Sequence, residues 1–223
     1  HPVAAGVPGD LAASLAALRA ALGGTRGAAG STPAAATAPA GDPYEAAAEA
    51  VAAVLGPEDI LVEEAISART AVLSRIPRTV PGSLFGEKGG TIGWGMPAAL
   101  GVKLGRPDRR VLAMVGDGGV LMAAQSLWTA ARYGIAVTFV VLNNRGYTIL
   151  KHGLAGLGGQ AARAGTYPGT DVPGVDLVGM ARSFGVAAEQ VGVSELPRAL
   201  RRALGAPGPV LLDVPLDVPV RPL

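Results

Sequence analysis

The chain has 223 residues, of which 49% are hydrophobic, so it is long and apolar enough to bury a sizeable core. Its formal net charge is +2, and its arginines are scattered instead of lining a groove with aromatic residues, which argues against nucleic acid as a partner. The sequence has no cysteine, no apolar stretch long enough to span a membrane and no recognisable export signal, so we expect a cytoplasmic protein without disulfides or thiolate metal sites.

Residues 1–23 are predicted to form one short amphipathic helix, with Asp10 as its N-cap and Gly23 at its end. Its apolar stripe consists of leucines at helical spacing, namely Leu11, Leu15, Leu18 and Leu22. Because a single helix needs neighbours to bury such a stripe, we interpret it as the tail of a preceding domain. Residues 24–43 are rich in Gly, Ala, Thr and Pro without periodicity, which predicts a flexible linker.

Residues 44–223 alternate between strand and helix patterns and are predicted to form one domain. Strands are expected at 59–63, 111–115, 137–142, 186–189 and 209–214. Helices are expected at 44–55, 67–73, 97–104, 120–133, 175–184 and 195–204. Two Gly-rich segments, 82–95 and 146–165, are expected to be irregular. The alternation predicts an α/β fold in which a mostly parallel sheet carries helices on both faces.

Polar motifs follow two of the predicted strands. Gly116-Asp117-Gly118 comes directly after the strand at 111–115, and Asn143-Asn144 comes directly after the strand at 137–142. Open α/β sheets bind ligands at the carboxyl ends of their strands, and the interval between the motifs is long enough for one crossover. Asp117 and Asn144 are therefore expected to project toward one point with oxygen ligands that suit Mg²⁺. The glycine signatures of a dinucleotide-binding domain and of a P-loop are absent from the sequence.

The pair of motifs resembles the cofactor motif of thiamine-diphosphate-dependent enzymes. The resemblance implies thiamine diphosphate and Mg²⁺ as cofactors, with the metal held by the side chains of Asp117 and Asn144 and by the carbonyl of Gly146. It also implies that residues 44–223 are the diphosphate-binding domain of such an enzyme. A structural Asp-Gly turn beside a capping Asn remains the alternative.

The resemblance extends to a larger set of cofactor-binding positions. Gly118 and Gly119 would let backbone N–H groups approach the phosphates. Ser67 would offer a hydroxyl to phosphate or serve as an ordinary N-cap, and Tyr147 would bind phosphate or simply pack. The full set is Ser67, Gly90, Thr91, Ile92, Gly116, Asp117, Gly118, Gly119, Asn144, Tyr147, Thr148 and Ile149.

Two further regions concern the pyrimidine and the substrate. In relatives, a carbonyl at the position of Gly90 accepts the aminopyrimidine N–H, and a large aliphatic side chain at the position of Ile92 keeps the cofactor bent. Ile149 and Leu150 are expected to face an apolar substrate pocket. The alternative for the region around Gly90 is a Gly-rich turn before a helix.

Several stretches, at 126–133, 171–176 and 208–214, resemble the benzoylformate decarboxylase branch of the family. Leu150 stands where pyruvate-type decarboxylases carry a Glu, so that acid is missing. Four other charged residues are conceivable acid or base groups, but we interpret them as exposed charges at the ends of elements: Glu63, Glu64, Glu87 and Lys88.

The resemblance implies a decarboxylase that acts on a small 2-oxo acid, and a carboligase similar to acetolactate synthase or a non-catalytic cofactor-binding module are the alternatives. The family's activating Glu lies in a pyrimidine-binding domain whose sequence context is absent from this chain. We therefore expect half of an active site, completed by that domain of the same or a partner chain, in a homo-oligomer. The chain would be the C-terminal part of a longer enzyme or one subunit of a split enzyme, inactive alone.

Overall fold

The computed structural model describes residues 9–22, 41–86 and 90–222. The chain divides into two units, His1–Thr37 and Ala38–Leu223. In the first unit, helix α1 (Leu11–Ala21) begins after Asp10, whose carboxylate accepts the N–H of Ala13 at 2.8 Å, and no described side chain of the helix is buried. Most of the predicted linker, 24–43, lies outside the described residues. None of the described helices is long and apolar enough to cross a membrane.

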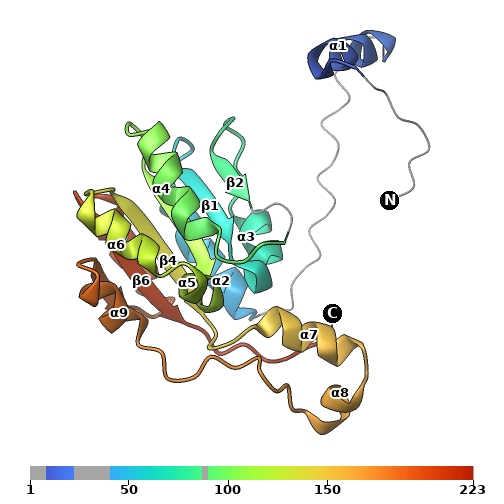
Figure 1. The fold of residues 1–223 in the computed structure, drawn as a ribbon, viewed down its shortest axis with the longest axis vertical. Helices are drawn as coiled ribbons and strands as arrows, with labels where there is room; N and C mark the ends of the chain where they lie inside the picture. Colours follow the sequence, from blue (N-terminus) through green and yellow to red (C-terminus); the bar gives the residue numbers. More distant parts are fainter. Residues whose placement is uncertain (1–8, 23–40, 87–89, 223) are drawn as a thin grey trace. The chain divides into compact units, whose positions relative to one another are not determined.

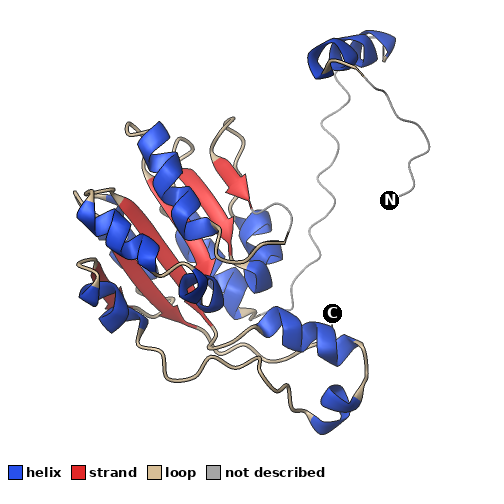
Figure 2. Cartoon of the chain, viewed as in Figure 1, coloured by secondary structure: helices blue, strands red, loops and turns tan. Residues whose placement is uncertain are grey.

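The second unit is built on one sheet of six parallel strands in the described part of the chain, in the order β2-β1-β3-β4-β6-β5 (Figures 1 and 2). The strands are β1 (Ile60–Glu64), β2 (Leu84–Gly86), β3 (Val111–Gly116), β4 (Val137–Asn143), β5 (Ala187–Gln190) and β6 (Val210–Pro215). The predicted α/β fold with a parallel sheet is confirmed.

Helices cover both faces of this sheet, because successive strand side chains point to opposite sides. Leu112 of β3, for example, belongs to one core layer, and its neighbour Ala113 belongs to the other. The first layer is covered by α2 (Pro43–Ala52), α3 (Arg69–Arg75) and α10 (Leu196–Leu204). The second is covered by α4 (Gly95–Gly105), α5 (Asp117–Met122), α6 (Gln125–Arg132) and α9 (Leu177–Ser183).

Three elements differ from the sequence predictions. The helix expected at 120–133 is divided into α5 and α6, and α5 already begins at Asp117. The segment 146–165, expected to be irregular, contains α7 (Thr148–Gly156) and α8 (Gln160–Ala164), which lie beyond the end of the sheet (Figure 1). The short edge strand β2 lies inside the Gly-rich segment 82–95. Each glycine in a helix costs about 1 kcal/mol relative to alanine, a penalty that tertiary context overrides in α7.

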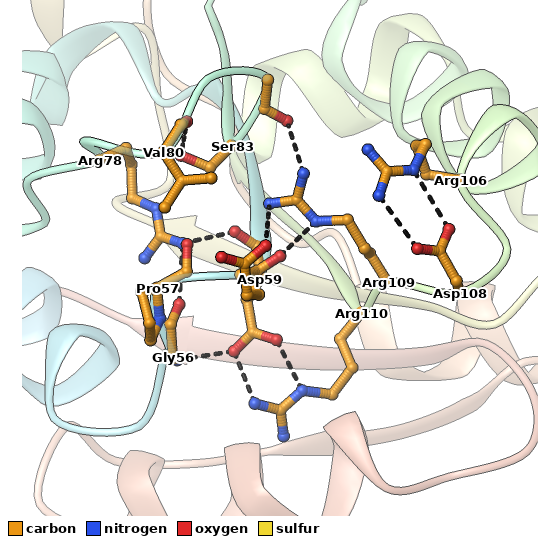
Figure 3. Close-up of polar contacts among 12 residues, drawn as sticks. Gly56, Pro57, Asp59, Arg78, Val80, Ser83, Arg106, Asp108, Arg109 and Arg110 are labelled. Carbon is orange, nitrogen blue, oxygen red and sulfur yellow. Dashed lines mark hydrogen bonds and ion pairs between the residues drawn. The ribbon is translucent and has the colours of Figure 1, made fainter.

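The amino end of β1 is held by a cluster of arginines (Figure 3). Arg110 forms a two-pronged ion pair with the buried carboxylate of Asp59, with N–O distances of 2.6 and 2.7 Å. The same carboxylate accepts the N–H of Gly56 at 2.7 Å. Arg78 and Arg109 donate to backbone carbonyls of the turn at 56–59. These contacts satisfy the carboxylate of Asp59 and carbonyls of the turn at 56–59, and thereby fix the entry of β1 between its neighbours.

We expect Asp59→Asn to lower the free energy of unfolding by about 2 kcal/mol, because the amide loses the ion pair with Arg110 in a buried setting. Urea denaturation followed by circular dichroism measures this change. Asp108→Asn is the matched control. Asp108 and its partner Arg106 are both exposed, so this substitution should leave the free energy of unfolding unchanged (Figure 3). Equal losses in both variants would contradict a specific role for Asp59.

Candidate functional site

A pocket lies at the carboxyl ends of β1, β3 and β4. The chain passes from β1 to β2 on one side and returns to β3 on the other, so this is the point at which the strand order reverses, where α/β sheets bind ligands. Most of the predicted site residues line this pocket: Ser67, Ile92, Gly116, Asp117, Gly118, Gly119, Asn144, Gly146, Tyr147 and Ile149. Residues from four separate segments of the sequence therefore meet at one place.

Four predicted residues are not among those that line the pocket. Gly90 and Thr91 are exposed on the loop that precedes Ile92. Thr148 is buried behind the pocket, and Leu150 is 54% exposed. Neighbouring residues of a helix point in different directions, so the helix that turns Ile149 inward turns Leu150 outward.

Asp117 is the first residue of α5 and only 3% of its surface is exposed. Its Oδ2 accepts the N–H of Gly146 at 2.9 Å, which ties the end of β3 to the loop after β4. Burial raises the pKa of this carboxyl, and backbone N–H groups of Gly118 and Gly146 oppose the rise. A bound cation would favour the charged form of this carboxylate and so offset the cost of burying it.

Asn143 and Asn144 have different surroundings although they are adjacent. The side-chain amide of Asn143 donates to Asp213 on β6 at 2.9 Å and anchors the end of β4. Asn144 instead lines the pocket, where its Nδ2 donates to the hydroxyl of Tyr44 at 2.7 Å. Its Oδ1 is buried and has no hydrogen-bond partner in the structure. A buried acceptor without a donor is costly, which indicates a missing ligand at this oxygen.

Two glycines are required by close contacts around the pocket. A Cβ on Gly118 would lie 2.4 Å from the ring of Tyr147, so the tyrosine ring packs directly on this backbone. A Cβ on Gly146 would lie 2.7 Å from the carbonyl oxygen of Thr170. Between the two asparagines and Gly146, Arg145 adopts a left-handed conformation with φ of 58°. The loop after β4 is therefore held in one shape by steric contacts as well as by hydrogen bonds.

The donor set in the pocket fits Mg²⁺. Within the described residues, no three His, Cys, Asp or Glu side chains gather at one point, so a soft or carboxylate-rich metal site is not formed there. Asp117 offers a carboxylate, Asn144 an unpartnered amide oxygen and Gly146 a carbonyl. Mg²⁺ prefers few protein carboxylates and takes its remaining ligands from phosphate and water. The observation that decides the fit is the buried, unpartnered Oδ1 of Asn144.

The interpretation of Glu63 and Glu64 as exposed charges is wrong, since 1% and 2% of their surfaces are exposed. Glu64 lines the pocket and accepts the backbone N–H groups of Gly93 and Gly95, so it ties the loop that carries Ile92 to β1. Glu63 faces the other way, where it pairs with Arg69 at 2.9 Å. The reason is tertiary: β1 lies inside the sheet, and backbone donors and an arginine compensate its terminal charges. Glu87 and Lys88 lie outside the described residues.

Ser67 connects two elements of the site. Its hydroxyl accepts the N–H of Ile149 at 3.0 Å and so links the end of β1 to α7. The interpretation of Ser67 as an N-cap is wrong, because Ser67 lies in a short 3-10 helix (Ile66–Ala68) and the N-cap of α3 is Ala68, without a side-chain bond.

Tyr44 is a polar pocket residue that the sequence analysis missed. It lies in the first turn of α2, is 4% exposed and contacts Asn144, which is 100 positions further along the chain. The sequence signal was only an aromatic residue within an alanine-rich helix, and such a residue is usually part of the core.

Residues 68–214 match the family described as "Thiamine pyrophosphate enzyme, C-terminal TPP binding domain". The chain belongs to this thiamine pyrophosphate (thiamine diphosphate) enzyme family. The predicted resemblance is therefore confirmed. The family match begins after β1, so Tyr44, Glu64 and Ser67 lie before the matched region although they line the same pocket.

Curated relatives include two enzyme types of the family. The chain is 39% identical over 163 residues to benzoylformate decarboxylase of Pseudomonas aeruginosa, a match that covers 72% of this chain and 30% of the relative. It is 36% identical over 181 residues to a putative acetolactate synthase large subunit of Mycobacterium tuberculosis, which covers 75% of this chain and 33% of the relative. The chain thus spans about a third of the length of these curated relatives.

Solved structures of the family have the same fold. A thiamine diphosphate-dependent 4-hydroxybenzoylformate decarboxylase of Rhodococcus jostii RHA1 superimposes with a TM-score of 0.71 at 34% identity, covering 82% of this chain and 34% of that one. Benzoylformate decarboxylase of Polynucleobacter necessarius gives a TM-score of 0.73 at 29% identity, covering 80% and 34%.

The buried position of Glu63 leads to a pH prediction. Burial raises the pKa of Glu63 above its ordinary value of 4.5, and the ion pair with Arg69 opposes that rise. A group with a raised folded-state pKa contributes stability below its unfolded pKa, and this contribution is lost as the pH rises through the folded value. We therefore expect the wild-type chain to lose stability relative to Glu63→Gln as the pH rises from 4.5, in urea titrations at a series of pH values. If the free energies of unfolding of the two proteins differed by a constant amount across that pH range, the raised pKa of Glu63 would be contradicted.

Proposed function

We propose that this chain is the C-terminal, cofactor-binding part of a thiamine diphosphate-dependent 2-oxo acid decarboxylase that resembles benzoylformate decarboxylase. The observation that carries the proposal is the buried, unpartnered Oδ1 of Asn144 in the same pocket as the carboxylate of Asp117. The family membership and the benzoylformate decarboxylase relatives support it.

The residues of the pocket would divide the binding of the cofactor between them. Asp117, Asn144 and the carbonyl of Gly146 would hold Mg²⁺. The backbone N–H groups of Gly118 and Gly119 would contact the diphosphate, with the ring of Tyr147 packed against Gly118. When bound, thiamine diphosphate supplies the carbon nucleophile and the electron sink that decarboxylation needs.

The other cofactor-binding residues belong to the opposite side of the pocket and to α7. Ile92 lines the pocket, and Glu64 fixes its loop through two backbone N–H groups. We propose that Gly90, Thr91 and Ile92 support the pyrimidine end. Ser67, Thr148 and Ile149 would complete the cofactor-binding wall, since Ser67 holds the backbone of Ile149. Leu150, exposed in this chain, would contact substrate only when another domain closes over α7.

The remaining half of the active site would come from a pyrimidine-binding domain of the same or a partner chain, which supplies the activating Glu. The exposed setting of Gly90 and Thr91 is consistent with such a partner. A small 2-oxo acid substrate, a homo-oligomer and a cytoplasmic location remain predictions. A carboligase related to acetolactate synthase is the second candidate, supported by 36% identity to the Mycobacterium tuberculosis relative. A non-catalytic cofactor-binding module is the third.

Isothermal titration of the chain with thiamine diphosphate tests the binding site. We expect binding with Mg²⁺ and none with EDTA, and Asp117→Asn should weaken binding by at least about 100-fold, because even outer-shell partners of a metal cost 10–100-fold. Asp217→Asn is the matched control: Asp217 is exposed and lies outside the pocket. Unchanged affinity in Asp117→Asn, or cofactor binding independent of Mg²⁺, would contradict the assignment.

Product analysis separates the two enzyme candidates. The chain should be joined to or mixed with a pyrimidine-binding domain and supplied with benzoylformate or pyruvate. A decarboxylase releases an aldehyde and one CO₂ per substrate molecule, whereas a carboligase joins two substrate molecules with loss of one CO₂ and forms a hydroxy-oxo acid, so the organic product distinguishes them. We expect the aldehyde from benzoylformate and no turnover by the chain alone. Turnover by the isolated chain would disprove the half-site, and no turnover in any combination that binds cofactor would favour the non-catalytic module.

A further inference from the structure

We propose that Tyr44 is a positioning residue that fixes the side-chain amide of Asn144 with its oxygen turned toward the cation. This inference rests on the proposed function, because it assumes that Asn144 is a metal ligand. It adds to the site a residue outside the family match at 68–214.

The contact between the two residues is direct and buried. The Nδ2 of Asn144 donates to the hydroxyl oxygen of Tyr44 at 2.7 Å. Tyr44 is 4% exposed, and its ring is part of the core under α2. A buried ring has little freedom to move, so its hydroxyl is a fixed acceptor.

The orientation of the amide matters because its two ends are chemically opposite. The oxygen of an asparagine side chain accepts hydrogen bonds or binds a cation, whereas its NH₂ group only donates. With Nδ2 held by Tyr44, the remaining atom, Oδ1, is left buried in the pocket wall without a donor. The reversed orientation would place N–H groups against the cation, and the hydroxyl of Tyr44 would then have to donate its proton to Oδ1.

The hydroxyl of Tyr44 is itself held in place. The side chains of Ser67 and Thr148 lie near it. Ser67 in turn accepts the N–H of Ile149. The hydroxyl proton of Tyr44 can therefore point to one of these oxygens, which leaves its lone pair for Asn144. This polar network connects α2, the end of β1 and α7 behind the candidate metal site.

Calorimetric titration of Mg²⁺ into the full chain with thiamine diphosphate tests the inference. Tyr44→Phe keeps the ring and removes the hydroxyl, and we expect the apparent Kd for Mg²⁺ to rise about tenfold. Tyr133→Phe is the matched control, because Tyr133 is 69% exposed and should leave the Kd unchanged. An unchanged Kd in Tyr44→Phe would overturn the inference while leaving the proposed function intact. Failure of the wild-type chain to bind thiamine diphosphate with Mg²⁺ would overturn the proposed function and, with it, this inference.

A second comparison, made in the Asn144→Asp variant, separates an effect on the orientation of the Asn144 amide from general structural support. A carboxylate has two equivalent oxygens, so Asn144→Asp no longer depends on which way the group is turned. In the Asn144→Asp variant we expect Tyr44→Phe to change the Kd for Mg²⁺ less than about twofold. The four proteins together form a double-mutant cycle. A tenfold loss in both backgrounds would show that Tyr44 acts through the shape of the pocket, and would overturn the inference.

A measurement without any ligand completes the test. In ¹⁵N spectra of the chain, the side-chain NH₂ resonances of Asn144 should shift and exchange faster with solvent in Tyr44→Phe than in the wild type. The amide resonances of Asn143, which donates to Asp213, serve as the internal control. Identical spectra of the Asn144 side chain in the two proteins would contradict the hydrogen bond on which the inference depends.

Discussion

The hydrogen bond from the N–H of Gly146 to the carboxylate of Asp117 is the interaction on which the candidate site depends. It joins the helix that begins at the end of β3 to the loop that leaves β4, and these two segments supply the potential cation ligands. The bond also compensates part of the cost of burying a carboxylate at a strand end. Without it, the loop after β4 would be held against α5 only by other contacts, such as the packing of Tyr147 on Gly118.

Asp59 at the amino ends of the strands and the pocket carboxylates at their carboxyl ends are compensated by different groups. At the amino edge, arginines donate to carbonyls of the turn before β1, and the carboxylate of Asp59 is fully paired (Figure 3). At the carboxyl edge, the buried carboxylates of Glu64 and Asp117 are held by backbone N–H groups. The first arrangement leaves its carboxylate already neutralised, whereas the second retains negative charge that attracts a cation. The candidate cation site therefore lies at the carboxyl ends of the strands.

The lining of the pocket is drawn from segments before and after the start of the family match. Tyr44 and Glu64 show why this matters. Both lie before that match, and both hold residues of the pocket in place through hydrogen bonds to an amide or to backbone N–H groups. The residues matched by the family model therefore include the proposed ligand donors, whereas Tyr44 and Glu64 lie before residue 68.

The sequence by itself determined the fold class and the strand-end motifs, because apolar periodicity and short polar motifs are local properties of the chain. It therefore located Asp117 and Asn144, and the family resemblance added Gly146; the structure brings all three into one pocket. It did not determine that Glu63 and Glu64 are buried, that α7 and α8 form in a Gly-rich segment, or that Tyr44 lies against Asn144. Those outcomes depend on contacts between segments far apart in the chain. Only the tertiary structure decides which backbone donors, arginines and hydroxyls compensate a buried polar group, because the same local sequence is exposed in one packing and enclosed in another.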